Sequence, residues 1–379
     1  MKRRTMLAFA GLLVLALALG ACSTTGGEEV EVTRIVEVTV EVPTEGETTT
    51  ETVIEQVQAP GYGEVLANVQ DRGRLICAGR TDLLGFGYLG DDGRNLGIDI
   101  DLCRAVAAAV LGDPEAVEIV PITAAERGPT IQSGEVDLLT RNVTWTTSRD
   151  AQWGNFTVVT FYDGQGFMVP SDLGVTELEQ LDGATVCVTS GTTTELNLAT
   201  AFRQLGMDLE TVVFEDTASV YNAYEEGRCD ATTSDKSQLL AVREGFADPS
   251  AHDILAVTIS KEPLTPVVPH GDDQWLDLVK TVLWGLINAE WLGVTQANVG
   301  DMVSSDNLNV LKMLGVEGEF GQAELGLSPT FMQDVLAAVG NYGEVYDRYL
   351  GPDGIAFTLP RGPNAHWTDG GLIYAPPMK

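Results

Sequence analysis

Basic residues are scarce in this chain. It has 22 lysine and arginine residues against 55 aspartate and glutamate residues, which gives a formal net charge of −33. This balance argues against a nucleic acid or an anionic membrane surface as the partner. It names no ligand, because an acidic protein can still carry a local basic site.

Histidine is also rare, and the cysteines are not spaced as metal ligands. The 3 histidines are scattered, and no two of the 5 cysteines have a CxxC spacing. The sequence has no serine-nucleophile elbow, and its glycine-rich loop LGFGYLGDDG lacks the Gly-Lys-Ser/Thr ending of a phosphate-binding loop. We therefore expect no metal, no cofactor and no hydrolytic activity.

A long apolar run occurs at the start of the chain, and no later segment reads as a membrane span. Basic residues at positions 2–4 precede the apolar residues 6–21, a run shorter than the roughly 20 residues of a spanning helix. The run ends in LGAC, which resembles a bacterial lipobox. We expect residues 1–21 to be a lipoprotein signal peptide and Cys22 to anchor an extracytoplasmic protein to a membrane through lipid. Secretion without lipid is the alternative.

Residues 22–62 are acidic and rich in threonine, glutamate and valine. The run EVEVTRIVEVTVEVPTE alternates strictly, which also suits a β-strand. Its apolar face has no partner of its own, so an extended, solvated tether is the preferred interpretation. A short coiled or β-paired stalk is the alternative.

From residue 63 onward, strand patterns alternate with helix patterns, and the series occurs twice. In the first series we expect strands at 74–78, 117–121 and 136–140 and helices at 98–110 and 123–134, the second shortened by Pro129. In the second series we expect strands at 184–189, 212–215 and 229–233 and helices after residue 192 and at 218–226. Each series is a doubly wound α/β unit.

Two extended runs, 161–169 and 259–268, connect the two units. We therefore expect an α/β fold of two lobes joined by two hinge strands. The first lobe would span residues 63–164 and the second 165–261, and residues 262–379 would return to the first lobe. A helix pattern at 274–288 belongs to this return, whereas the structure after about residue 310 is left open.

Polar side chains follow several of the predicted strands, where clefts of α/β sheets open. Thr144 and Arg149 follow the third strand, the turn 191–193 follows the first strand of the second unit, and Asp235 follows its last strand. An arginine fork and the N–H groups of a helix start suit the α-carboxylate of an amino acid. Asp235 and the Thr144 hydroxyl suit its ammonium group.

Each of these residues also has a structural explanation when it is taken singly. Arg149 could form a surface ion pair with Asp150, and Thr192 could do no more than cap its helix. Their coincidence at several strand ends, divided between two lobes, favours a ligand site.

The chain resembles the extracytoplasmic amino-acid-binding proteins of ABC importers, and most of all their general L-amino-acid-binding branch. The resemblance runs from about Leu66 to Val299 and is carried by GIDIDLCRAVAAAVLGDPE, IQSGEVDLLTRNVTWTTSRD, FYDGQGFMV, CVTSGTTTELNLA, YEEGRCDATTSDKS and ISKEPLTPVVPHGDDQW. It implies a periplasmic-binding-protein fold of type II. It also implies a monomer that captures L-amino acids with broad specificity by hinge closure and delivers them to a membrane permease.

The resemblance further implies which side chains contact the ligand. Arg149, helped by Thr193, would bind the carboxylate, and Asp235 would bind the ammonium. Asn142 and Thr144 would line the first lobe. An aromatic residue after the first strand would pack on the ligand, but the spacing of LLGFGYLGDD leaves Phe86 and Tyr88 both open. The full expected set is Phe86, Asn142, Thr144, Arg149, Thr192, Thr193 and Asp235.

Two other functions remain as alternatives. The same scaffold serves periplasmic dehydratases of prephenate-like acids, which need a proton-transfer residue in the cleft, and no histidine or lysine is placed there by a motif. A ligand-sensing module for a separate receptor is the other alternative.

Four cysteines remain besides Cys22, and an even set in an exported protein indicates disulfides. Cys77 and Cys103 fall in the first predicted lobe, whereas Cys187 and Cys229 fall in the second. A bridge between lobes would block closure, so we expect Cys77–Cys103 and Cys187–Cys229. Buried free thiols are the alternative.

Overall fold

The structure is a computed structural model that describes residues 33–44, 47–58 and 62–379. The expected signal peptide, residues 1–21, and the lipidation site Cys22 lie outside the described residues. The strands β1 (Thr33–Thr44) and β2 (Glu47–Gln58) pair as a two-stranded sheet. Our preferred interpretation of this segment as an unpaired tether is wrong over these residues. The alternating valines have the period of a strand, and the β-paired alternative describes them.

Lobe 1 is built on a five-stranded mixed sheet in the order β7-β3-β8-β17-β9. Its strands are β3 (Leu75–Gly79), β7 (Val117–Pro121), β8 (Leu138–Leu139), β9 (Asn155–Phe156) and β17 (Val267–Val268). β3 is parallel to β7 and β8, whereas β17 is antiparallel to β8 and β9. A small antiparallel sheet follows β3 and consists of β4 (Asp82–Leu83), β5 (Gly87–Leu89) and β6 (Asn95–Leu96). The chain thus enters lobe 1 twice, because β17 comes after lobe 2 in the sequence.

The helices of lobe 1 come from two stretches of the chain, one before lobe 2 and one after it. The helices that precede lobe 2 are α1 (Glu64–Arg72), α2 (Ile98–Leu111), α3 (Arg127–Ser133) and α4 (Thr147–Gln152). Those that follow it are α8 (Asp273–Leu292), α9 (Val299–Met302), α10 (Leu308–Met313), α11 (Phe331–Val339) and α12 (Tyr342–Leu350). Within the described part of the chain, no helix combines the length and the apolar character needed to cross a membrane.

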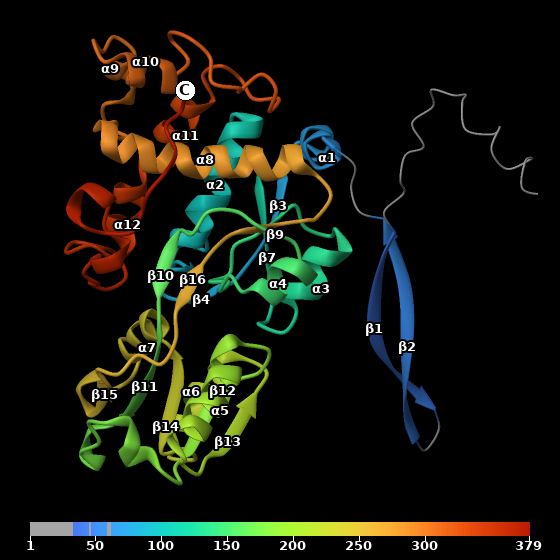
Figure 1. The fold of residues 1–379 in the computed structure, drawn as a ribbon, viewed down its shortest axis with the longest axis vertical. Helices are drawn as coiled ribbons and strands as arrows, with labels where there is room; N and C mark the ends of the chain where they lie inside the picture. Colours follow the sequence, from blue (N-terminus) through green and yellow to red (C-terminus); the bar gives the residue numbers. More distant parts are fainter. Residues whose placement is uncertain (1–32, 45–46, 59–61) are drawn as a thin grey trace, which may run out of the picture. The chain divides into compact units, whose positions relative to one another are not determined.

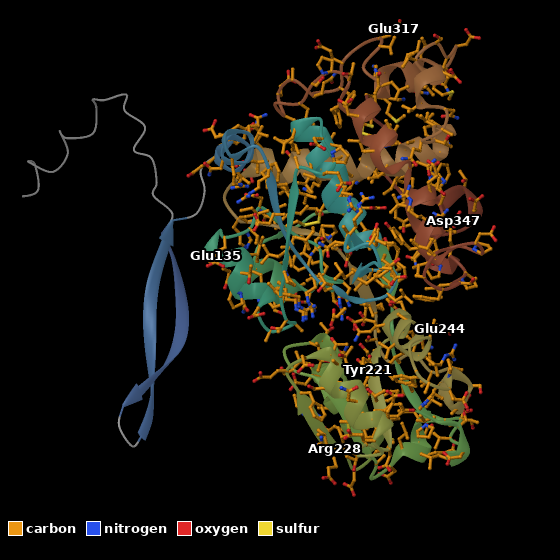
Figure 2. All side chains as sticks on the ribbon, turned by 180° about the vertical axis from the view of Figure 1, so that it is seen from behind. Glu135, Tyr221, Arg228, Glu244, Glu317 and Asp347 are labelled. Carbon is orange, nitrogen blue, oxygen red and sulfur yellow. A yellow bond between two sulfur atoms is a disulfide. The ribbon has the colours of Figure 1, made fainter. Side chains whose placement is uncertain are left out.

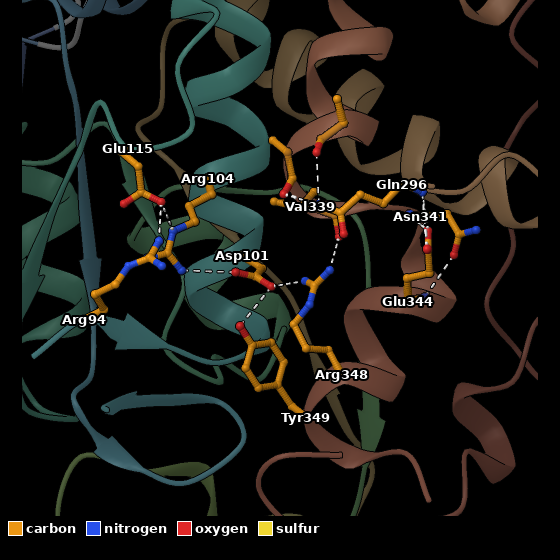
Figure 3. A network of polar contacts seen from close by, with 12 residues as sticks. Arg94, Asp101, Arg104, Glu115, Gln296, Val339, Asn341, Glu344, Arg348 and Tyr349 are labelled. Atoms are coloured by element: carbon orange, nitrogen blue, oxygen red, sulfur yellow. Dashed lines mark hydrogen bonds and ion pairs between the residues drawn. The ribbon is translucent and has the colours of Figure 1, made fainter. Parts of the chain in front are cut away.

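The region after residue 310, which the sequence left open, belongs to the lobe 1 core. Helix α2 is buried along almost its whole length, and α11 and α12 pack against it. Asp101 on α2 accepts hydrogen bonds from Arg104 (3.2 Å) and Tyr349 (3.0 Å) and pairs with Arg348 (Figure 3). A buried carboxylate that is paired and hydrogen-bonded in this way avoids the cost of an isolated charge.

Lobe 2 has a five-stranded mixed sheet in the order β13-β12-β14-β11-β15. Its elements are β11 (Gln165–Pro170), β12 (Thr185–Thr189), α5 (Thr193–Leu205), β13 (Glu210–Phe214), α6 (Thr217–Glu225), β14 (Ala231–Asp235), α7 (Lys236–Arg243) and β15 (His252–Ile254). Phe167 and Met168 are consecutive on β11 but belong to different core clusters. Because successive strand residues point to opposite faces, both faces of this sheet are covered by apolar side chains.

The lobes are joined by two neighbouring strands. β10 (Phe161–Asp163) pairs with β16 (Glu262–Leu264) in antiparallel fashion, and the register places Asp163 opposite Glu262. Figure 1 shows the two strands side by side between the lobes. Asn364 also holds β10, because its side chain accepts from Tyr162 N (2.6 Å) and donates to Tyr162 O (3.1 Å). The expected α/β fold of two lobes with two hinge strands is confirmed.

Most predicted elements are present, and α3 differs for a local reason. Thr123 and Glu126 form a reciprocal cap, with Thr123 N donating to Glu126 Oε2 (2.6 Å) and Glu126 N donating to Thr123 Oγ1 (3.4 Å). The α-helical turns begin only at Arg127 and last seven residues. Pro129 within this helix has no N–H to donate, which agrees with the expected shortening.

Both predicted disulfides are confirmed. Cys77–Cys103 joins β3 to α2 within lobe 1. Cys187–Cys229 joins β12 to the segment just before β14 within lobe 2. Neither disulfide crosses the hinge, so both are compatible with a relative movement of the lobes.

Removal of the lobe 2 disulfide should destabilise the protein. Cys187 and Cys229 are 42 residues apart, and a bridge that closes a loop of this size typically contributes about 2–4 kcal/mol by restricting the unfolded chain. We expect the double variant Cys187→Ala, Cys229→Ala to lose that amount of unfolding free energy in urea titrations. Equal unfolding free energies for the oxidised wild type and the double variant would contradict this expectation.

Candidate functional site

A small polar cavity lies between lobe 1 and lobe 2. Lobe 1 contributes Arg80, Ala124, Arg127, Arg141, Asn142 and Thr144 to its wall. Lobe 2 contributes residues at the ends of β12 and β14 and at the starts of α5 and α6, among them Thr192, Thr193, Thr217 and Asp235. The cavity therefore lies at strand ends, where ligands of open α/β sheets bind. Figure 2 shows the side chains of both lobes, with Tyr221 labelled in lobe 2.

The two lobes are in direct contact around this cavity. Arg80 of lobe 1 donates to the lobe 2 side chains Gln238 (2.9 Å) and Thr217 (3.1 Å). Arg127 donates to Gly191 O (3.2 Å), which lies on the turn before α5. These contacts link the lobes across the cavity and describe a closed arrangement.

Arg149 lies on α4, next to the cavity and in contact with both lobes. Its terminal nitrogens donate to Thr144 O (3.1 Å) and Gly191 O (3.4 Å). Burial lowers the pKa of Arg149 to about 10, and the nearby carboxylates of Glu262 and Asp235 act in the opposite direction. The guanidinium group therefore stays charged at neutral pH. It forms no ion pair with Asp150, which instead accepts from Phe156 N (3.2 Å).

Trp153 holds Arg149 in place and was missed by sequence reasoning. The Arg149 guanidinium carbon lies 4.6 Å from the centre of the Trp153 ring, and that of Arg127 lies 6.0 Å away. Both distances are in the range of cation–π attraction. A Cβ atom on Gly128 would lie 2.7 Å from Trp153 Nε1, so glycine leaves the space that the indole needs. No local pattern in the sequence signals this packing.

Asp235 is the last residue of β14 and is buried at the cavity wall. Burial raises the pKa of Asp235 well above its usual range, and the charges of Asp163 and Glu262 raise it further. Arg127 and a hydrogen bond from Asn142 oppose this effect. The ionised carboxylate would therefore be stabilised by a cation in the cavity.

Asn142 has the only positive φ angle among the described residues other than glycine, at 34°. Such a backbone conformation is sparsely populated and is held by its surroundings. The Asn142 N–H donates to Asp99 Oδ2 (2.9 Å), and the side chain accepts from Arg80 (3.2 Å). Burial raises the pKa of Asp99 to about 6. The hydrogen bonds with Asp99 and Arg80 hold Asn142 in place, and Asn142 lines the cavity.

Thr192 and Thr193 form the start of α5 and serve different purposes. The Thr192 hydroxyl accepts from Glu195 N (3.1 Å) and donates to Thr189 O (2.7 Å), so it is used in capping the helix. The Glu195 side chain accepts from Gly191 N (3.0 Å) rather than completing a capping box with Thr192. The first turn of a helix has N–H groups without partners inside the helix, and Thr193 and Thr194 of this turn line the cavity.

Glu262 on the hinge strand β16 was also missed. Its side chain is 1% exposed and accepts hydrogen bonds from Thr144 of lobe 1 (2.6 Å) and Thr193 of lobe 2 (2.8 Å). Asn197 (2.9 Å) and Ser260 also donate to it. One hinge carboxylate thus orients a predicted ligand-binding hydroxyl from each lobe. The sequence placed Glu262 within a hinge run but provided no reason to connect it with the cavity.

Phe86 does not lie at the cavity. It is buried in the lobe 1 core, with its ring edge-on to Phe161 at 5.1 Å between centroids. Tyr88, the other candidate, lies in the small antiparallel sheet and also does not line the cavity. Both positions follow from the β4–β5–β6 sheet, which turns the loop after β3 back onto lobe 1. The structure gives no support to packing of Phe86 on a ligand.

Three buried arginines at the cavity were not predicted: Arg80, Arg127 and Arg141. The sequence positions of two of them could have indicated a place at the cavity. Arg80 lies two residues after the first predicted strand, and Arg141 directly follows the third predicted strand. The rule that ligand groups lie at strand ends applies to both. Arg127 lies on α3, and only the tertiary structure brings it to the cavity.

Comparison with known proteins agrees with this geometry. The general L-amino acid-binding periplasmic protein of Rhizobium johnstonii is 46% identical over 316 residues, which cover 83% of this chain and 92% of that protein. The glutamate/glutamine/aspartate/asparagine-binding protein of Rhodobacter capsulatus is 44% identical over 85% of this chain and 96% of its own length.

A solved structure has the same fold over most of the chain. The ABC transporter periplasmic binding protein from Brucella ovis with glutathione bound is 45% identical, with a TM-score of 0.80, and the match covers 83% of this chain and 99% of that chain. The family model described as bacterial extracellular solute-binding proteins, family 3, matches residues 75–296. This chain belongs to that family of extracellular solute-binding proteins.

Proposed function

We propose that this protein captures free L-amino acids outside the cytoplasmic membrane and delivers them to the permease of an ABC transporter. The observation that carries the proposal is the pairing of two opposite charges at one interlobe cavity. Arg149 lies beside the start of α5, and the buried Asp235 lies at the cavity wall. Such a pair complements the two charged groups of an amino acid.

In the proposed mechanism, the hinge strands let the lobes close around the ligand. Lobe 1 would hold the α-carboxylate with Arg149 and the α-ammonium with the Thr144 hydroxyl. Lobe 2 would then add the N–H groups at Thr193 and the carboxylate of Asp235. Closure would exclude water from these charged contacts and strengthen them, as in hinge closure around other ligands.

The relatives support a site that recognises the α-amino acid end of its ligand. The Rhizobium and Rhodobacter proteins are named for binding amino acids. The Brucella protein has bound glutathione, whose glutamyl end retains a free α-ammonium and a free α-carboxylate. The dehydratase alternative has no support among these relatives, which are binding proteins. A lipid anchor at Cys22 and a monomeric state belong to this proposal and rest on the sequence.

Removal of either charge should abolish tight binding. In Arg149→Ala or Asp235→Ala the partner group of the ligand would be buried without a counter-charge, which typically costs about 2–5 kcal/mol. We expect a loss of affinity of at least about 30-fold by isothermal titration calorimetry. Arg94→Ala is the matched control, because Arg94 is an exposed lobe 1 arginine paired with Glu115. Wild-type affinity in either cavity variant would refute the assignment.

Ligands that lack one of the two charged groups should bind weakly. A decarboxylated amine would leave Arg149 unpaired, and a keto acid would leave Asp235 unpaired, because buried polar groups without partners are costly. Competition against a bound amino acid would measure both effects. If the amine or the keto acid competed as well as the parent amino acid, the site would not require both charged groups, and the assignment of Arg149 and Asp235 would be wrong.

Affinity should fall as the pH is lowered. Burial raises the pKa of Asp235 and brings the pKa of Asp163 to about 6, and the carboxylates of Asp163 and Glu262 both raise that of Asp235. A proton and the ligand ammonium would compete for the Asp235 carboxylate, so affinity is full above the raised pKa of Asp235 and is lost below it. Titrations between about pH 8 and about pH 5 would measure the slope, which Asp235→Asn should flatten. A pH-independent dissociation constant would contradict this competition.

A further inference from the structure

Three arginines at the cavity have no part in the proposed clamp for the α-carboxylate and α-ammonium groups. Arg80, Arg127 and Arg141 are 2%, 4% and 6% exposed, so each is almost completely removed from bulk water. All three line the same cavity as Thr193 and Asp235. Buried cations of this kind need a nearby anion or a dense set of hydrogen bonds.

Arg80 has a direct ion-pair partner, whereas Arg127 and Arg141 have only more distant carboxylates. Arg80 is paired with Asp82 (2.7 Å) and donates to side chains of lobe 2. Arg127 donates only to the carbonyls of Ala124 (2.8 Å) and Gly191 (3.2 Å). Arg141 donates from Nε to Ile122 O (2.6 Å), and within residues 62–379 no partner is found for its two terminal nitrogens. In the same range neither guanidinium forms an ion pair.

The carbonyl contacts fix the orientation of both guanidinium groups. Arg127 and Arg141 each use Nε to hold the turn at Ile122–Ala124. A guanidinium group that is tied through Nε still presents terminal N–H donors in a planar fork, which matches a carboxylate. Both residues contribute to the cavity wall. The turn therefore positions two arginine side chains at the cavity before any ligand arrives.

The charges around these arginines indicate a shortage of anions. Burial and the charge of Arg80 together lower the pKa of Arg141 to about 9, and Asp82, Asp99 and Glu126 only partly offset the effect. Burial also lowers the pKa of Arg127, with repulsion from Arg149 and Arg141. Like charges in a water-poor site raise one another's energy, and an anion among them would relieve this.

Arg127 connects the two ends of the site. It is repelled by Arg149, the proposed partner of the α-carboxylate, and by Arg141, and it is attracted by Asp235. An amino acid held at Arg149 and Asp235 would thus have Arg127 and Arg141 within the same cavity as its side chain. A short side chain that ends in a carboxylate would supply the missing anion.

We propose that Arg127 and Arg141 form a second anion subsite, and that the preferred ligands are L-amino acids whose side chain ends in a carboxylate. This inference rests on the proposed function, because it places the α-groups at Arg149 and Asp235. Neutral amino acids would still bind through their α-groups. They would leave the two guanidinium groups without a counter-charge and therefore bind more weakly.

Glutamate and glutamine provide the sharpest test, because they are nearly equal in size and differ in side-chain charge. Isothermal titration calorimetry would compare both ligands on the wild type, Arg141→Gln and Arg127→Gln. A charge-assisted hydrogen bond predicts that the wild type binds glutamate about 10–100-fold more tightly than glutamine. In Arg141→Gln this ratio should fall to about one to three, whereas glutamine affinity should change less than about threefold.

Controls separate a loss of the subsite from a loss of the fold. Arg94→Gln, at an exposed arginine of the same lobe, should keep the wild-type ratio, and Arg141→Lys should retain part of it because the charge remains. Retained glutamine binding in Arg141→Gln would show that the cavity is intact. Equal affinity of the wild type for both ligands, or an unchanged ratio in both glutamine variants, would overturn the subsite. Failure of the wild type to bind any amino acid would instead overturn the proposed function.

Discussion

The antiparallel pair β10–β16 is the constraint on which the rest of the site depends. Because the chain passes between the lobes on two strands only, the lobes can move relative to each other while each keeps its own sheet, core and disulfide. Glu262 lies on this pair and accepts from Thr144 of one lobe and Thr193 of the other. The same strand that permits movement thus aligns the two hydroxyls when the lobes meet. The C-terminal segment supports this arrangement, since Asn364 holds both backbone groups of Tyr162 on β10.

The cavity is rich in buried arginines, whereas the chain as a whole is strongly acidic. The protein has a formal net charge of −33, yet four arginines are buried at or beside the cavity. Arg149 and Asp235 form the proposed clamp, whereas Arg127 and Arg141 face the cavity without a carboxylate partner. A net charge describes solubility and long-range fields, and it does not predict the local field of an enclosed site. An amino acid with a carboxylate in its side chain would match these arginines better than an amino acid with a neutral side chain would.

Local patterns identified the candidate site residues that lie at strand ends. Thr144, Arg149, Thr193 and Asp235 follow strands, and the structure brings them to the same interlobe region. Phe86 shows the limit of the same reasoning, because the small sheet after β3 turns its ring into the core. Glu262 and Trp153 have no local signal, since their roles arise from contacts with residues that are distant in the sequence. Side-chain direction within a loop depends on the elements that pack against it, which spacing alone does not contain.

The sequence by itself determined the order of the main strands and helices of the two α/β units, the two-lobe α/β fold and the pairing of cysteines within each lobe. These features follow from periodicity, caps and turn residues, which act over a few neighbours, and from the requirement that the hinge stay free. Only the tertiary structure decided that the residues after 310 pack on α2 and that Glu262 orients hydroxyls of both lobes. It also decided that Arg127 and Arg141 meet at one cavity. These outcomes depend on burial and on electrostatic contacts between distant segments, and such contacts exist only once the chain has folded.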